Sequence, residues 1–142
     1  MMMRFPIRLI ALFVLAVGYC LGGAGVGAQT IQASSTDIAL KNGESTEFSD
    51  IWWISADCRS LLISTPEVEI MEGPPGVSAV IKPAKVVPRT VSCANAIPGG
   101  KLIITAKNIE EYSRSTMVLR ITFKTRNGDR QRSRNVRVTL FP

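Results

Sequence analysis

The clearest pattern along the chain is a strict alternation of apolar and polar side chains near the C-terminal end. Apolar residues occupy every second position in two runs, 117–123 and 136–140, on either side of the pair Asn127-Gly128. A period of two places alternate side chains on opposite faces of a strand, and Asn-Gly favours a tight turn. The pattern therefore predicts a long β-hairpin with one core face and one solvent face.

The rest of the chain after the first 35 residues is also β-prone, and no helical period is sustained for ten residues. Further strands are predicted at 36–40, 44–48, 51–54, 60–64, 67–71, 77–81, 86–93 and 102–106. Asn42-Gly43 predicts a hairpin between the first two strands, and Gly73-Pro74-Pro75-Gly76 predicts a hairpin or a corner between sheets. Residues 94–100 are expected to form a loop, and 108–112 a single helical turn. The fold class predicted is all-β, an antiparallel two-sheet β-sandwich.

This predicted architecture resembles that of bacterial immunoglobulin-like domains, and the resemblance implies an immunoglobulin-like arrangement of two sheets. It does not extend to the residues that mark antibody domains. There a core tryptophan lies between two cysteines, and a tyrosine stands two positions before the second. In this chain Trp52 and Trp53 precede Cys58, and Val91 stands two positions before Cys93.

The N-terminal segment has the pattern of an export signal. Arg4 and Arg8 precede an apolar run, and the glycine-rich stretch after it ends in Val26-Gly27-Ala28. We expect residues 1–28 to be a signal peptide and residues 29–142 to form a single domain. The alternatives are an uncleaved membrane anchor and lipidation at Cys20. Export by this route predicts a periplasmic or secreted protein.

The cysteine count then indicates one disulfide. With Cys20 assigned to the signal peptide, Cys58 and Cys93 remain as a pair in an oxidising compartment. A bridge between them would stabilise the domain by about 3 to 4 kcal/mol on a chain-entropy estimate.

Positive charge is concentrated at the C-terminal end. Residues 29–112 hold 7 basic and 10 acidic residues, whereas residues 113–142 hold 8 basic residues and 1 acidic one. Seven cations are expected to crowd onto the solvent side and tip of the final hairpin: Arg120, Lys124, Arg126, Arg130, Arg132, Arg134 and Arg137. Such a cluster would attract an anionic glycan, a lipid headgroup or an acidic protein surface, or it would only make the protein soluble and protect an edge strand. Nucleic acid is not expected as a partner, because the chain has an export signal and no nucleic-acid motif.

Trp52 and Trp53 are the second candidate binding feature. As neighbours on a strand they should point to opposite faces, so that one joins the core while the other is exposed or covers an edge. An exposed tryptophan could stack on a sugar or anchor a protein interface. The alternative is that one ring packs on the disulfide and a loop half-buries the other.

Catalysis is not expected from this composition. The chain has no histidine, which is the commonest general base and metal ligand. The acidic pairs Glu67/Glu69 and Glu110/Glu111 could do acid and base chemistry, but they are typical of a solvated strand face and a polar loop. No metal or cofactor motif is present in the sequence.

The function predicted from the sequence is that of a non-catalytic, exported interaction domain. It would contact an anionic envelope surface, a glycan or a protein through the basic hairpin. Contact with the surface of a membrane is one form that this binding could take. The first alternative is an assembly component that pairs with another chain through an exposed sheet edge. A small glycan-active enzyme is the weaker alternative.

Overall fold

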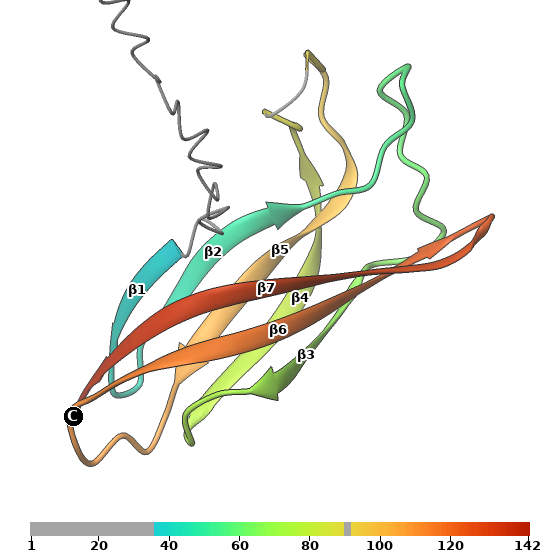
Figure 1. Cartoon of the computed structure of the whole chain (residues 1–142). Helices are drawn as coiled ribbons and strands as arrows, with labels where there is room; N and C mark the ends of the chain where they lie inside the picture. The colour runs from blue at the N-terminus through green and yellow to red at the C-terminus, as the bar shows by residue number, and fades with distance from the viewer. Residues whose placement is uncertain (1–35, 90–91) are drawn as a thin grey trace, which may run out of the picture. The chain divides into compact units, whose positions relative to one another are not determined.

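The computed structural model describes residues 36–89 and 92–142, and these fold into seven β-strands (Figure 1). The predicted signal peptide, residues 1–28, lies outside the described residues. The strands are β1 (Thr36–Lys41), β2 (Ser45–Ile51), β3 (Glu67–Glu72), β4 (Val77–Val86), β5 (Ile97–Ala106), β6 (Ser113–Thr125) and β7 (Gly128–Phe141). They form two sheets, one with the order β1-β7-β6-β3 and one with the order β2-β5-β4. The prediction of an all-β chain with two sheets is confirmed, and the pairing is antiparallel as predicted except that β1 pairs parallel with β7.

The C-terminal hairpin forms the two central strands of the four-stranded sheet. β6 and β7 pair antiparallel from Thr125↔Gly128 to Ser113↔Leu140, as the alternation predicted. The turn places Gly128 at a φ of 96°, a conformation that glycine adopts without strain. β3 pairs antiparallel with β6, whereas β1 pairs parallel with β7.

Two short connections, at Asn42-Gly43 and at residues 73–76, lead from one sheet to the other. At Asn42-Gly43 the turn is formed, with Gly43 at a φ of 84° and the Glu44 N–H donating to the Lys41 carbonyl at 3.0 Å. The predicted hairpin between 36–40 and 44–48 is nevertheless wrong, because β1 joins β7 and β2 joins β5. The segment 73–76 likewise separates β3 in one sheet from β4 in the other, which is the predicted corner.

Both sheets contribute side chains to one hydrophobic core. Met117, Leu119 and Ile121 of β6 are fully buried, and so are Leu102 and Ile104 of β5 in the other sheet. These residues belong to a single cluster with members from β1, β2, β4 and β7. Burial of this shared face is the main source of stability, since apolar surface removed from water contributes about 25 cal/mol per Å².

Several local predictions differ from the structure. The strands predicted at 51–54 and 60–64 are not formed, since β2 ends at Ile51 and only the isolated bridges Ile54↔Ser60 and Leu62↔Thr125 follow it. Trp52 and Trp53 therefore lie just after a strand and not on one. The strand predicted at 86–93 is wrong for its described residues after Val86, where β4 ends. Strand β5 begins at Ile97 and so includes Pro98, Gly99 and Gly100, which were expected to be a loop. The single helical turn expected at 108–112 is absent, and this segment is an irregular connection with Asn108 at a φ of 57°.

Candidate functional site

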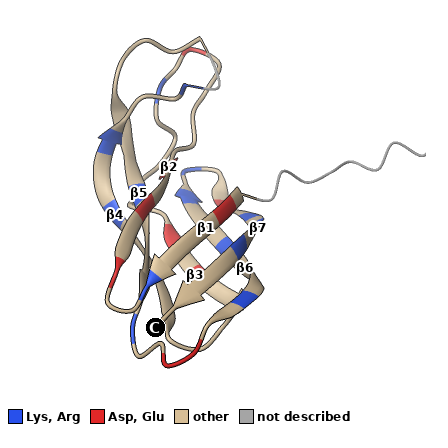
Figure 2. Ribbon diagram, turned by 90° about the vertical axis from the view of Figure 1, so that its left-hand side faces the viewer, with Lys and Arg blue, Asp and Glu red and all other residues tan. Residues whose placement is uncertain are grey.

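The seven predicted cations of the C-terminal hairpin do not share one face. Cross-strand partners lie on the same side of a sheet, and Arg120 is paired with Ser133 whereas Arg132 is paired with Ile121. Figure 2 shows the resulting basic segments along β6 and β7. The expectation that all seven lie on the solvent side and the tip is therefore only partly right. Arg126 and Arg130 lie at the exposed tip, whereas Arg132 and Arg134 lie on the face opposite to Arg120, Lys124 and Arg137.

The outer face carries cations that are already paired with carboxylates. Arg120 lies 3.7 Å from Glu69, Lys124 lies 2.7 Å from Asp129, and Arg137 lies 3.2 Å from Asp37. The hydrogen bond to Asp129 raises the pKa of Lys124 above its ordinary value. These exposed pairs neutralise one another and each contributes little stability.

The inner face of β7 carries three arginines in a row, Arg130, Arg132 and Arg134, which we call the arginine ladder. They share strand parity with Val136 and Val138, which are fully buried, so the ladder continues the core face towards the hairpin tip. Their cross-strand partners on β6 are all buried core residues: Phe123, Ile121 and Leu119. The three cations therefore continue the core face towards the hairpin tip, where Arg134 is half-buried and Arg130 and Arg132 are exposed.

Arg134 and Arg132 are held by the segment that ends β2 and follows it. The Arg134 guanidinium donates to Ser49 Oγ at 2.9 Å, and burial together with the nearby charge of Arg132 lowers the pKa of Arg134. The Arg132 guanidinium lies 4.5 Å from the centre of the Trp53 ring, in cation–π contact. Trp53 in turn packs on Phe123, with 5.0 Å between ring centres.

The ladder lies next to two grooves, each lined by one tryptophan. The Trp52 groove, of about 610 Å³, is lined by Trp52, Arg89, Arg132 and Arg134 among others. The Trp53 groove, of about 990 Å³, is lined by Trp53, Arg59, Arg126 and Arg130 among others. The neighbouring tryptophans therefore serve different surfaces, and both rings are half-buried.

The charge of the ladder is not compensated by carboxylates. Across residues 36–89 and 92–142, none of the three ladder arginines forms an ion pair with an acidic side chain. Asp50 also lines the Trp52 groove, but it lies 3.6 Å from Lys101 of β5. The two grooves are therefore cationic and aromatic.

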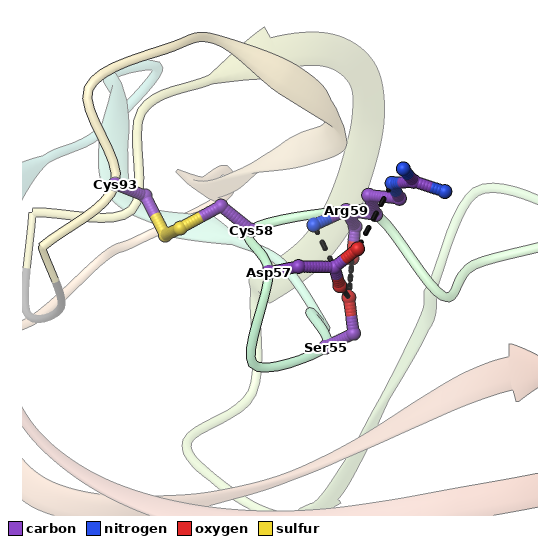
Figure 3. Close-up of a disulfide and its surroundings, with 5 residues drawn as sticks. All are labelled: Ser55, Asp57, Cys58, Arg59 and Cys93. Carbon is purple, nitrogen blue, oxygen red and sulfur yellow. Dashed lines mark hydrogen bonds and ion pairs between the residues drawn. A yellow bond between two sulfur atoms is a disulfide. The ribbon is translucent and has the colours of Figure 1, made fainter.

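The predicted disulfide is present and fixes the loops beside these grooves (Figure 3). Cys58 and Cys93 have Cα atoms 5.7 Å apart, and they join the segment after β2 to the segment before β5. A tight turn accompanies Cys58, in which the Arg59 N–H donates to Ser55 Oγ at 3.2 Å and Arg59 Nε lies 2.9 Å from Asp57. The hydrogen bond from Ser55 lowers the pKa of Asp57, and Arg59 adds to this effect. A disulfide of this kind is compatible with an oxidising compartment.

The acidic pairs lie away from the ladder. Glu67 and Glu69 lie on the same face of β3, as expected, and Glu69 is the partner of Arg120. Glu110 and Glu111 line a shallow pocket with Tyr112 beyond the end of β5. In the described part of the chain, no group of three His, Cys, Asp or Glu residues could hold a metal ion. No helix among those residues is long and apolar enough to cross a membrane.

Replacing Trp53 with alanine should lower the free energy of unfolding by about 2 kcal/mol, because the ring packs on Phe123 and covers the edge of the core. Trp52→Ala is the matched control, since Trp52 is not among the residues packed on the core cluster. It should cost less than about 1 kcal/mol. Urea denaturation of both variants measures the difference, and equal losses would contradict this assignment of the two rings.

Several residues of this site were not predicted from the sequence. Ser49, Arg89 and Phe123 join the grooves through tertiary contacts between distant segments. A search of protein-family models finds no match for the chain, and neither the curated proteins nor the solved structures include a significantly similar one.

Proposed function

We propose that this protein is an exported, non-catalytic interaction domain that binds anionic partners through the arginine ladder. The signal-like N-terminus supports export to the periplasm or the outside of the cell. The disulfide agrees with such a compartment. The partner classes considered are an anionic glycan, a lipid headgroup and an acidic protein surface.

The observation that supports this proposal best is the uncompensated charge of the ladder. Alternate residues on one strand face are about 7 Å apart, so Arg130, Arg132 and Arg134 repel one another. Arg134 is also half-buried, which weakens its hydration. Among the described residues no acidic side chain forms an ion pair with these three cations, so a bound anion would offset their mutual repulsion.

The tryptophans supply a second part of the proposed binding surface. Trp53 holds the Arg132 guanidinium over its ring, which limits the freedom of that side chain before any ligand arrives. Each groove also joins arginines from separate segments, such as Arg89 with Arg134. Guanidinium groups that converge in this way suit the oxygen atoms of phosphate, sulfate or carboxylate groups.

We also propose that the fold is a two-layer β-sandwich of immunoglobulin-like architecture. The shared core of the two sheets favours this arrangement. The corner at residues 73–76 and the turn at Asn42-Gly43, which both lead from one sheet to the other, agree with it. In such an arrangement loops gather at the ends of the layers, and the disulfide-linked loops form one such group.

The test is binding to dextran sulfate, a soluble polyanion, with the protein recovered after export from a bacterial host. The triple variant R130Q/R132Q/R134Q should bind about 100-fold more weakly, since three charge-assisted contacts are lost. The matched control R120Q/K124Q/R137Q removes the same charge from the outer face and should change affinity by less than about fivefold. Equal effects of the two variants would show that net charge alone is responsible, and the ladder proposal would fail.

The second candidate function is assembly through the free edge of β4. Among the seven described strands this ten-residue strand pairs with β5 alone, and Val80 on it is 48% exposed. Pro83 and the neighbouring lysines interrupt the second half of this edge, which is typical of protection against unwanted pairing. Binding through β4 would survive high salt, whereas binding through the ladder would not.

A further inference from the structure

An exposed apolar segment, residues 61–63 between β2 and β3, lies beside the end of the β6–β7 hairpin. Leu61 is 38% exposed and Ile63 is 61% exposed, although both are large aliphatic side chains. The alternate residue, Leu62, packs against the core and forms a β-bridge with Thr125. Successive side chains in an extended segment point to opposite sides, so Leu61 and Ile63 project away from the core together.

The backbone of this segment is fixed rather than loose. The Leu61 N–H donates to the Trp53 carbonyl at 2.9 Å, and the Ile63 N–H donates to the Lys124 carbonyl at 3.0 Å. Leu62 anchors the segment between these two hydrogen bonds. The aliphatic pair is thus presented in a set position, which lowers the entropy lost when a partner binds it.

Cations line the groove beside Leu61. Leu61 lines the Trp53 groove together with Arg59, Arg126 and Arg130, and Ile63 is hydrogen-bonded to the backbone of Lys124. The carboxylates nearby, Asp57 and Asp129, are already paired with Arg59 and Lys124. The surface therefore combines exposed aliphatic side chains with Arg126 and Arg130, for which the structure gives no ion pair among the described residues.

We propose that the anionic partner is the surface of a phosphate-bearing lipid membrane, bound with Leu61 and Ile63 inserted between the headgroups. This inference rests on the proposed function and names its partner. A soluble acidic polymer needs only the cations and offers no apolar phase for two aliphatic side chains. A lipid surface provides both, because phosphates lie directly above hydrocarbon.

The experiment measures sedimentation of the exported protein with vesicles that contain phosphatidylglycerol and with vesicles of phosphatidylcholine alone. The wild-type protein should bind the anionic vesicles and bind the neutral ones at least about tenfold more weakly, since each basic residue near an anionic surface contributes about fivefold. The variant L61N/I63N should bind anionic vesicles at least about tenfold more weakly than wild type. Its affinity for dextran sulfate should stay within about twofold of wild type, because the cations are unchanged.

The matched control is M71N/V80N, which changes two other exposed apolar side chains, 42% and 48% exposed, on β3 and β4. It should bind anionic vesicles as wild type does, and circular dichroism should give the same melting temperature for the three proteins within a few degrees. The lipid proposal is overturned if L61N/I63N binds vesicles like wild type, if the control weakens binding equally, or if neutral vesicles bind as well as anionic ones. Binding to dextran sulfate without any binding to vesicles would also overturn it and leave the ladder proposal standing. Failure to bind either probe would overturn both.

Discussion

Replacement of Cys58 and Cys93 together by serine should lower the free energy of unfolding by about 3 to 4 kcal/mol. The two cysteines are 35 positions apart, so the bridge removes much of the freedom of the unfolded chain between them. That loss is a large share of the roughly 5 to 15 kcal/mol that stabilises a typical domain. Urea denaturation of the C58S/C93S variant measures it.

The control for this prediction is the wild-type protein unfolded in the presence of a reducing agent. It should have the same urea midpoint as C58S/C93S, because both lack the bridge and neither changes the core cluster shared by the two sheets. The bridge joins loops rather than core strands, so the folded sheets should keep their far-ultraviolet circular dichroism in the variant. An unchanged urea midpoint would mean that the bridge adds nothing to the stability of the fold.

The features that could be predicted from sequence are those that depend on local pattern or simple counting. The β6–β7 hairpin is confirmed because alternation over both arms leaves one register that buries the apolar residues. The disulfide is confirmed because only two cysteines remain after residue 28. In both cases the residues that decide the structure are visible without knowledge of the tertiary fold.

Strand pairing over the rest of the chain could not be predicted in the same way. Asn42-Gly43 favours a tight turn whether the flanking strands pair with each other or enter different sheets. The choice is made by distant partners, since β1 pairs with the last strand of the chain and Leu40 is buried in the shared core. Local turn chemistry carries no information about those partners.

The position of the arginine ladder could have been found from the sequence, but the prediction placed it on the wrong face. Arg130, Arg132 and Arg134 have the same parity as Val136 and Val138, so a continuous strand must place all five on one side. The expectation of a solvent face came from the charge of the side chains and not from their parity. The contacts that hold the ladder, Ser49 and Trp53, depend on tertiary structure and have no local signal.

Gly99 is where the sequence pattern was most misleading, because Pro98-Gly99-Gly100 is typical of a loop but lies within β5. The strand continues through this position because glycine has no side chain, which lets the backbone of Ile51 in β2 come close to Gly99. A Cβ atom at Gly99 would lie 2.5 Å from the Ile51 carbonyl oxygen and 2.8 Å from Val86 Cγ2. Both neighbours are buried, so neither has free space into which it can move.

Replacement of Gly99 by alanine should therefore lower the free energy of unfolding by about 3 kcal/mol, since overpacking against a fixed backbone forces β2 and β5 apart. The control is Gly43→Ala, at a φ of 84° with no atom within 4 Å of the added Cβ. Its only penalty is the left-handed backbone, which costs about 1 kcal/mol. Backbone conformation alone predicts the opposite order, because Gly99 does not have a positive φ. Urea denaturation of the two variants distinguishes the explanations. A larger loss of stability in Gly99→Ala means that the close approach of β2 requires the glycine. A larger loss in Gly43→Ala would refute this explanation of why β5 begins at Ile97.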